Sequence, residues 1–486
     1  MFAAINAIIW GKILLFVLIP IGLWFTIRSR FVQVRHFTEM FSIFGQAFER
    51  KTDQPSSFQA LALSVAGRVG AGNIAGVAVA IALGGPGAIF WMWLVGLVGM
   101  ATSFFECSIA QLFKRREASG NFRGGPAFYI QHGLKKRLGA AAPILAGTYS
   151  ILLLVAFGFA FNVLQSYAVT TSLNGAFGVP APAVGVVLAV IVGVVIFGGV
   201  SRITRVVEVV VPVMAISYIL LVLFILATRI TEVPMALWTI VESAFGLNEA
   251  VAGGIGVALT QGIRRGLFSN EAGLGSAPNV AAVAYVRHPA RQGIVQAFSV
   301  FIDTLIICTC TASIILLSGV DINDPNIDGV LLTQISLAAH VGDWADEFVA
   351  FALMLFVFSS IMYNYFLGEN ALDFFVKDNK LVFNIFRIAT LGFVIVGANI
   401  DLSAAFGFAD AAMGMLALVN LFALVLLFPI GLRVMRDFDA QRRNGVRPVL
   451  DPLDYQDLDI DESAWTLSED DAAYLAEKRA KMPSET

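Results

Sequence analysis

Charge is scarce in this chain. Only 14% of its 486 residues are Asp, Glu, Lys or Arg, whereas a soluble domain carries about 25%. Hydrophobic residues make up 58%, and the mean hydropathy is +0.79. The net charge of −3 gives no basis for binding nucleic acid. The composition therefore predicts a polytopic membrane protein.

Cysteine and histidine are also sparse, with three and four residues. Cys107, Cys308 and Cys310 lie in apolar segments, and their odd number indicates neither a disulfide framework nor a zinc site. The histidines form no HExxH or similar pair. The sequence thus shows neither the metal cluster nor the nucleophile–base pair that a membrane-embedded enzyme would need.

Long apolar runs are what the chain has instead. A membrane-spanning helix needs about 20 mainly apolar residues, and eleven stretches meet that requirement. No small-residue cleavage site follows the first run, so we expect a retained span there. The predicted spans are 8–28, 58–84, 88–113, 143–172, 183–200, 206–228, 250–272, 293–318, 347–370, 381–398 and 411–432.

Lysine and arginine are distributed unevenly between these spans. The connections 27–57 and 114–140 are rich in both, whereas 173–182, 319–346 and 399–410 contain neither. Loops that carry positive charge stay in the cytoplasm. We therefore expect a multi-pass protein of a bacterial-type plasma (inner) membrane, with the N-terminus outside and the C-terminus in the cytoplasm.

Two predicted spans are interrupted by glycine and polar residues. RVGAGNIAGVAVAIALGGPG occupies 68–87, and GIRRGLFSNEAGLGSAP occupies 262–278. The first does not fit a dinucleotide fingerprint, since the spacing differs and no strand precedes it. Gly72 and Gly76 form a GxxxG pair, which by itself is equally consistent with close helix packing.

The positions of these two stretches favour a functional interpretation. Each lies in the first span of a five-span half, and interrupted spans at corresponding positions indicate the central site of a transporter. Because five is odd, the second half must be inserted upside down. We predict an N-terminal helix and loop (1–57), a first repeat (58–228), an external connection (229–249), an inverted second repeat (250–435) and an acidic cytoplasmic tail (436–486).

A broken helix exposes backbone N–H and C=O groups, which are costly in a membrane unless something polar satisfies them. N–H groups at a half-helix suit a carboxylate, and freed carbonyls suit an ammonium group or Na⁺. The pattern therefore predicts a binding site for a zwitterion and a cation.

The motifs VGAGNIAGVAVAIALGGPGAIFWMW, GMATSFFE, RGGPAFYI and GIRRGLFSNEAGLGSAP closely resemble the alanine/glycine:cation symporter family, also called sodium:alanine symporters. The resemblance covers about 58–435. It implies an all-α LeuT-type 5+5 inverted repeat preceded by one helix, eleven transmembrane helices in all, and uptake of alanine or glycine driven by Na⁺. The family usually has Gly-Thr-Gly-Asn where this chain has Gly70-Ala71-Gly72-Asn73.

The resemblance and the breaks together nominate the site residues. The expected substrate contacts are Gly70, Ala71, Gly72, Asn73, Gln165, Phe268, Ser269, Asn270 and Tyr363. The expected Na⁺ ligands are Val69, Gly72, Ser359 and Ser360, because LeuT-type folds hold Na⁺ between two hydroxyls of this helix and carbonyls of the first broken helix. Mid-span serines can also simply bond back to their own helix.

Other polar residues at membrane depth have open alternatives. Asn162 and Gln165 share a helix face and could hydrogen-bond between helices or line the site. Arg68 and Glu271 are expected in gating or ion pairs near the cytoplasmic side, with Arg68, Arg264 or Arg265 neutralising Glu271. A proton-coupled carrier would instead use Glu271, Glu106 or Asp303 as its titrating group.

The sequence therefore predicts a Na⁺-coupled symporter for alanine or glycine, embedded in the lipid bilayer, that works by alternating access and is not an enzyme. Na⁺ is the coupling ion, and the oligomeric state is not readable. The polar, acidic tail is predicted to be solvated and mostly disordered.

The Lys and Arg asymmetry generates a first testable prediction. A tag on the C-terminus should be protected from membrane-impermeant reagents in intact cells and react after permeabilisation. A matched tag on the N-terminus should react in intact cells. The reverse labelling pattern would overturn the predicted topology.

Overall fold

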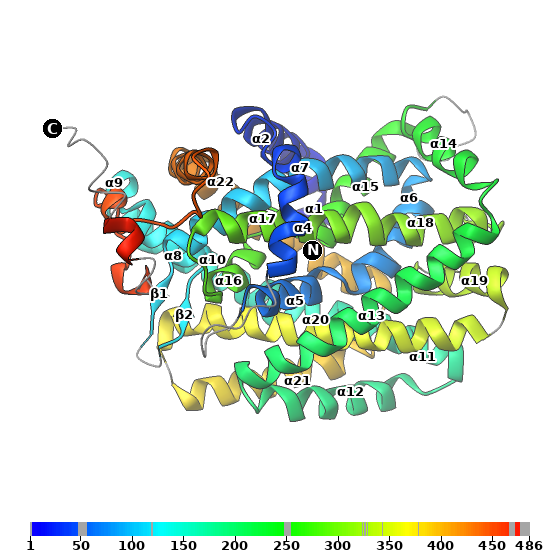
Figure 1. Cartoon of the computed structure of the whole chain (residues 1–486). Helices are drawn as coiled ribbons and strands as arrows, with labels where there is room; N and C mark the ends of the chain where they lie inside the picture. Colours follow the sequence, from blue (N-terminus) through cyan, green and yellow to red (C-terminus); the bar gives the residue numbers. More distant parts are fainter. Residues whose placement is uncertain are drawn as a thin grey trace.

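The computed structural model describes residues 2–46, 56–117, 120–246, 254–322, 324, 327, 329–342, 344–377, 379–465 and 472–476. Predictions that fall on 47–55 (including Arg50 and Lys51), on 250–253, and on 466–471 and 477–486 of the tail lie outside the described residues. The described chain is a bundle of long helices with one small hairpin (Figure 1).

The first half of the chain contains α1 (Phe2–Ile8), the π-helix η1 (Ile9–Leu14), α2 (Leu15–Arg28), α3 (Val32–Arg35), α4 (Phe37–Gln46), α5 (Ser57–Arg68), the π-helix η2 (Gly72–Gly76), α6 (Val77–Gly84), α7 (Gly87–Leu112), α8 (Pro126–Phe128), the π-helix η3 (Tyr129–Gly133), α9 (Lys135–Leu138), α10 (Ala141–Leu153), the π-helix η4 (Leu154–Ala160), α11 (Phe161–Phe177), α12 (Ala181–Ile196), α13 (Val200–Thr228) and α14 (Val233–Ala244).

The second half contains α15 (Gly254–Asn270), α16 (Ser276–Val283), α17 (Pro289–Val300), the π-helix η5 (Phe301–Ile307), α18 (Cys308–Leu317), α19 (Gly329–Val341), α20 (Trp344–Val376), α21 (Lys380–Gly397), α22 (Leu402–Arg443) and the short 3₁₀ turns η6 (Pro452–Tyr455) and η7 (Glu462–Trp465).

Each predicted span coincides with a helix or a pair of helices. Within the described residues, eight helices are long and apolar enough to cross a membrane, and a ninth span is the pair Ser57–Arg68 and Gly72–Gly84, which is bent by 48°. The structure is therefore an all-α polytopic membrane protein with eight or nine such spans. The predicted spans 183–200 and 250–272 correspond to α12 and α15, which have 16 and 17 residues.

The sequence did not predict several short elements. The hairpin of β1 (Arg115–Arg116) and β2 (Phe122–Arg123) pairs Arg115 with Arg123. α14 lies inside the predicted connection 229–249, and α19 packs against α6 and η2. Figure 1 shows α14 and α19 at the opposite end of the bundle from β1, β2 and α9.

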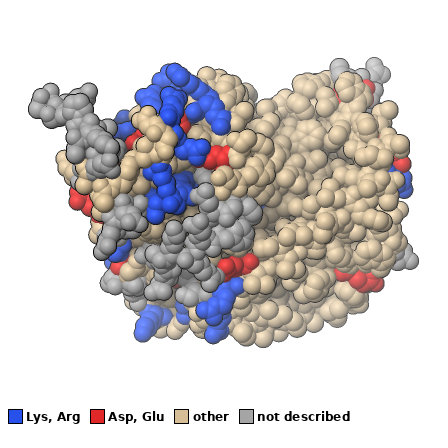
Figure 2. Space-filling model, in the orientation of Figure 1, with Lys and Arg blue, Asp and Glu red and all other residues tan. Residues whose placement is uncertain are grey.

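Lysine and arginine gather at one end of the molecule. Figure 2 shows them at the end that carries β1, β2 and α9, which we call the basic end. Lysine and arginine are therefore unevenly distributed in space as well as along the chain. Which side of the membrane the basic end faces stays a prediction.

The C-terminal segment packs against the basic end, so the prediction of a solvated, mostly disordered tail is wrong for its described part. Leu450 N donates to the Arg287 carbonyl at 2.8 Å. Tyr455 and Trp465 are buried, with the Arg433 guanidinium over the Tyr455 ring and the Lys114 ammonium over the Trp465 ring. Buried aromatic rings with cations on their faces hold the segment in place.

Aspartates of this segment pair with the basic loops. Asp459 lies 2.9 Å from Arg115 and 2.8 Å from His132, and Asp457 lies 2.8 Å from Arg433. Asp461 accepts from the Arg116 N–H at 2.8 Å. The acidic residues that suggested solvation are thus the counter-charges of the basic loops, which the sequence had assigned only to topology.

The pKa values of Asp459 and His132 determine how this contact responds to pH. Burial opposes the charge of Asp459, but hydrogen bonds from His132 and Arg115 outweigh it and lower its pKa. Burial also lowers the pKa of His132 below its usual value, despite Asp459 beside it. A lowered histidine pKa means that docking loses stability as the pH falls through about 6.5, and the carboxylate adds a further loss only at lower pH.

We therefore predict that the double variant Asp457→Asn/Asp459→Asn loosens the tail. Each pair is partly exposed and worth little alone, so we expect a few-fold faster proteolysis within 449–465. Acidification from about pH 7.5 to about pH 5.5 should act in the same direction on the unmodified protein. The exposed Glu462 provides the control Glu462→Gln, and equal proteolysis of all three proteins would contradict the docking.

Candidate functional site

The first break lies between α5 and η2. α5 ends at Arg68, Val69 and Gly70 leave the helix, and Gly72 already begins the π-helical turn η2. The interruption predicted within 68–87 therefore lies at Val69 and Gly70, and Gly72 is already helical. Because a π-turn widens the helix and is frequent at functional sites, η2 displaces the following side chains from a regular helical face.

Side chains satisfy the backbone of this break. Gly70 N donates to Asn73 Oδ1 at 3.0 Å, and Ala71 N donates to Gln165 Oε1 at 3.1 Å. Gln165 comes from α11, so the break is held by a neighbouring helix. The buried N–H groups that the sequence offered to a ligand carboxylate are already bonded within the protein, as membrane burial requires.

Gly70 and Gly72 are needed for space. Neither has a positive φ. A Cβ on Gly70 would lie 2.4 Å from Ser360 Oγ, and one on Gly72 would lie 2.9 Å from the Phe268 ring. A Cβ on Gly76 would be 3.7 Å from that ring, an ordinary contact. Gly72 thus lets Phe268, from the second broken helix, lie directly on the first.

The second break joins α15 to α16 through residues 271–275. Glu271 has φ +56°, and Gly273 and Gly275 have φ +94° and +82°, a left-handed region that favours glycine. Freed backbone groups are again bonded by side chains. The Asn270 carbonyl accepts from Arg68 Nε at 2.6 Å, and the Leu274 carbonyl accepts from Tyr149 Oη at 3.1 Å.

A buried carboxylate joins the two breaks. Asp303, from η5, accepts from Asn73 Nδ2 of the first break at 2.6 Å and from Ser269 Oγ of the second break at 2.6 Å. Thr304 Oγ1 donates to it at 2.8 Å, and Cys308 Sγ lies 3.1 Å from Ser269 Oγ. All five residues are buried. A buried carboxylate surrounded by hydroxyl groups and an amide N–H donor is suited to exchange these donors for a hard cation or to take up a proton.

The sequence had named Asp303 only as one of three carboxylates that a proton-coupled carrier could use. Asn73 and Ser269 were nominated, but their partner was not. Asp303 lies 230 residues from Asn73, and nothing in the local pattern FIDTLII marks it as facing the breaks. Its intramembrane position was the one available signal.

Among the described residues, Arg68 and Glu271 bond to neutral groups instead of forming the expected ion pairs. Arg68 donates to Asn270 O, to Gln296 Oε1 at 3.0 Å and to Ser103 Oγ at 3.2 Å, and also to Ser299 Oγ. In the described chain its partners are these neutral oxygens. With the Gln296 carbonyl at 3.4 Å, five neutral acceptor oxygens fit the planar guanidinium because its N–H groups point in fixed directions.

Glu271 is likewise held by hydroxyls. It accepts from Ser276 Oγ at 2.6 Å and from Tyr363 Oη at 2.8 Å, so Tyr363 reaches the second break from α20. Glu106 accepts from Gly273 N and Asn420 Nδ2, each at 3.2 Å. These carboxylates connect α7, α16, α20 and α22 around the break.

The two serines nominated for Na⁺ differ from each other. Ser360 Oγ donates to the Ala66 carbonyl of α5 at 2.9 Å and also contacts its own Phe356 carbonyl. Ser359 Oγ contacts the Phe356 carbonyl and Met214 Sδ of α13. Only Ser360 therefore makes a direct contact with the first broken helix.

The polar pair on α11 separates into two roles. Asn162 bonds back to the Phe157 and Gly158 carbonyls, which the π-helix η4 leaves available, and accepts from Asn364 Nδ2 at 3.1 Å. Gln165 instead reaches the first break. Interhelical bonding thus describes Asn162 and Asn364, while Gln165 contacts the first break.

The site is covered at the end opposite the basic end. The Phe268 ring stacks on Phe161 at 5.1 Å between ring centroids and contacts Phe406 at 5.9 Å. Arg265 lies 4.4 Å above the Phe406 ring and forms a buried 2.6 Å ion pair with Asp410. These groups come from α11, α15 and α22.

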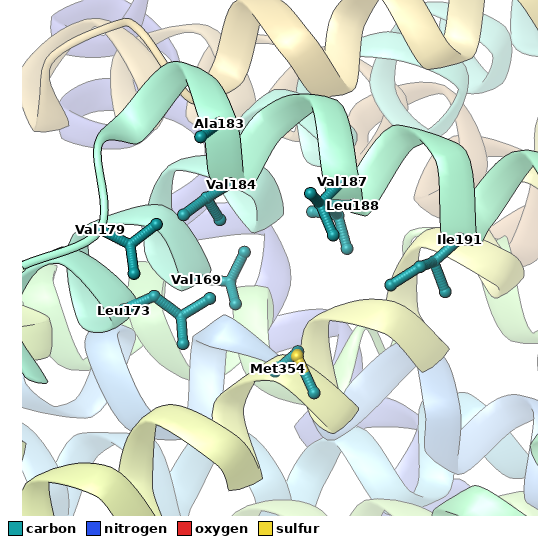
Figure 3. Close-up of a pocket in the computed structure, with 9 residues that line it drawn as sticks. All are labelled: Val169, Leu173, Val179, Ala183, Val184, Val187, Leu188, Ile191 and Met354. Carbon is teal, nitrogen blue, oxygen red and sulfur yellow. The ribbon is translucent and has the colours of Figure 1, made fainter. Parts of the chain in front are cut away.

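A cavity of about 180 Å³ lies elsewhere, between α11, α12 and α20 (Figure 3). All nine residues that line it are apolar, including Val169, Val184, Leu188 and Met354. A zwitterion or a cation needs polar partners, so this cavity does not match the chemistry of the breaks.

The geometry defines a class of protein. A helical membrane bundle in which two interrupted helices meet around buried polar side chains is a secondary transporter. The fold is similar to that of a solved manganese transporter from Eremococcus coleocola, with a TM-score of 0.51, 12% sequence identity and 78% of each chain covered. This likeness supports a LeuT-like fold and nothing about the transported ion.

The chain belongs to the sodium:alanine symporter family, whose sequence profile matches residues 1–452. It is 48% identical to the amino-acid carrier protein AlsT of Bacillus subtilis over 91% of this chain and 92% of that protein. It is 42% identical to the probable sodium/glutamine symporter GlnT of the same organism, over 93% and 92%. The chain is therefore a transporter and not an enzyme.

Gly72→Leu tests the contact between the two broken helices. The new side chain would meet the Phe268 ring, and overpacking a buried contact costs about 1–3 kcal/mol. We expect the variant to insert in the membrane but to lose substrate binding. Gly76→Ala, which has room, should bind nearly normally. Binding and thermal stability of both purified variants check this, and equal damage in the two would favour simple helix packing.

Proposed function

We propose that this chain is a Na⁺-coupled symporter that imports a small neutral amino acid, alanine or glycine, by alternating access. The single observation that carries the proposal is the Asp303 carboxylate, which bonds both broken helices through Asn73 and Ser269. A cation bound there would neutralise the buried charge and hold the two breaks together. Ion binding would then be coupled to the geometry of the substrate site.

The architecture in this proposal is an eleven-helix LeuT-type protein. To the nine spans by length we add α12 and the broken pair α15 and α16. The N-terminal helix then precedes a first repeat over 58–228 and an inverted repeat over 250–435. The N-terminus lies outside, and the basic end lies in the cytoplasm of a bacterial-type cell, where positive charge is retained.

The substrate would lie between the breaks. Its contacts would come from Gly70–Asn73 and Gln165 on one side and from Phe268–Asn270 on the other, with Tyr363 bordering Gly67 and Glu271. The close approach of Phe268 to Gly72 favours a small side chain. GlnT is named for glutamine, so glutamine belongs in any substrate panel.

Two ion positions are offered by the residues. The first is the group Asn73, Ser269, Asp303 and Thr304. The second is Ser360 with the carbonyls near Ala66 and Val69, while Ser359, which faces Met214, would contribute less. Na⁺ is transported cargo at either position, and its ligands would be these oxygens together with substrate oxygens.

The second candidate function is proton coupling, which the same carboxylate favours. Asp303 is buried between neutral donors, and an intramembrane carboxylate of this kind can exchange a proton instead of binding Na⁺. The two functions differ in which gradient drives uptake.

Asp303→Asn distinguishes them. If Asp303 binds Na⁺, the concentration of Na⁺ required for alanine uptake should rise on the order of 10–100-fold, with substrate binding at saturating Na⁺ less affected. If it carries protons, uptake should lose its response to an imposed pH gradient while Na⁺ has no effect. Radiolabelled uptake into proteoliposomes at fixed membrane potential measures both.

Matched variants complete the experiment. Asp401 caps α22 by accepting from Ala404 N, and asparagine caps equally well, so Asp401→Asn is the control. Ser360→Ala should shift the Na⁺ dependence more than Ser359→Ala. Normal Na⁺ and pH responses in both Asp303→Asn and the double variant Ser359→Ala/Ser360→Ala would refute both ion positions.

A further inference from the structure

The N-terminal helix meets the covering layer of the site at one residue. Trp10, in η1, is buried at 1% exposure, although it lies on a helix that runs along the outside of the bundle. Its Nε1–H donates to the Asp410 carbonyl of α22 at 3.1 Å. Asn6 Nδ2 donates to the Gly407 carbonyl of the same helix at 3.0 Å. The helix is therefore bonded to the turn of α22 that carries Asp410.

This turn of α22 provides one half of the cover. Asp410 Oδ2 lies 2.6 Å from Arg265 Nη2 and 3.6 Å from Arg264 Nη1. Phe406, one turn earlier, packs under Arg265 and against Phe268. The other half belongs to α15, since Arg265 and Phe268 are both on that helix. To open this end, α15 must separate from α22 and break the ion pair.

Trp10 also covers Arg264, the second arginine paired with Asp410. The Arg264 guanidinium lies 5.5 Å from the centre of the indole ring. Through this ring the N-terminal helix contacts the charged residues around Asp410. Gly414 allows the close approach, because a Cβ there would lie 2.6 Å from Ile9 and 3.3 Å from Trp10 Nε1. An ion pair screened from water is stronger than an exposed one.

We propose that Trp10 is a positioning residue of the gate formed by Arg265 and Asp410. It fixes the α22 turn that carries Asp410 and covers the neighbouring Arg264 with an aromatic ring, so the N-terminal helix sets how readily this end of the site opens. The proposal rests on the proposed function only in treating this end as one of two that open alternately.

A native cysteine reports on the opening. Cys308 is buried beside Ser269 and Asn73, and the other cysteines of the chain are Cys107 and Cys310. In a Cys107→Ala/Cys310→Ala background, the alkylation rate of Cys308 by a charged, membrane-impermeant maleimide measures access to the site. This measurement needs neither substrate nor coupling ion, so a wrong assignment of either leaves it valid.

Trp10→Phe retains an aromatic ring and removes the Nε1 donor. We expect the alkylation of Cys308 to become roughly tenfold faster, equivalent to about 1.4 kcal/mol in the opening equilibrium. Asp410→Asn should also accelerate it. The double variant should react no faster than Asp410→Asn alone, because both changes weaken one interaction and their effects are then not additive.

The control is Trp24→Phe, on the same helix. Trp24 is 39% exposed and packs on Phe25 and Phe428, away from the ion pair. The alkylation rate of Cys308 in Trp24→Phe should equal that in the parent protein. The proposal would be overturned by an unchanged alkylation rate in Trp10→Phe or by additive effects in the double variant. It would also be overturned if Trp10→Phe reacted faster but had a lower thermal midpoint of unfolding than Trp24→Phe, because general destabilisation would then explain the faster reaction.

Discussion

The need to satisfy backbone groups without water governs this structure. Two helices stop inside the apolar region, and each stop exposes N–H and C=O groups that a membrane cannot solvate. Side chains from elsewhere in the chain meet this need: Gln165 for Ala71, Arg68 for Asn270 and Tyr149 for Leu274. Each of these bonds also fixes one broken helix to a neighbour, so the bonds that stabilise the breaks also define the site.

The side-chain bonds at the two breaks have a consequence for ligand binding. Since the breaks are satisfied by side chains, a substrate that binds between them, as we propose, would exchange with bonds such as that between Ala71 N and Gln165, with little net change in the number of bonds. Exchange of this kind costs less than exposing a bare N–H group. Asp303 differs from the other buried carboxylates in touching both breaks at once, whereas Glu106 and Glu271 lie around the second break only.

The two ends of the molecule are held in different ways. At the basic end, partly exposed aspartates of the C-terminal segment pair with arginines and His132, so the contact responds to salt and pH. At the opposite end, Arg265 and Asp410 are buried among aromatic rings, so that contact depends on packing. An alternating transporter whose ends are closed by different physical means can have each end adjusted separately.

The sequence by itself determined the helical membrane class, the eight or nine spans that the described residues support and the location of both breaks. These depend on local properties: apolar length, glycine in a buried helix and the placement of charge. It also nominated Asn73, Gln165, Ser269 and Tyr363, which the structure places at the breaks.

Only the tertiary structure decided which residues bond to each other. Asp303 meets Asn73 across 230 residues and Arg265 meets Asp410 across 145, and the acidic tail docks on loops more than 300 residues away. The turns η2, η4 and η5 rotate side chains off a regular helical face, so even a correct list of spans leaves their partners undetermined. Pairing between distant segments follows from how the helices pack, which no local pattern records.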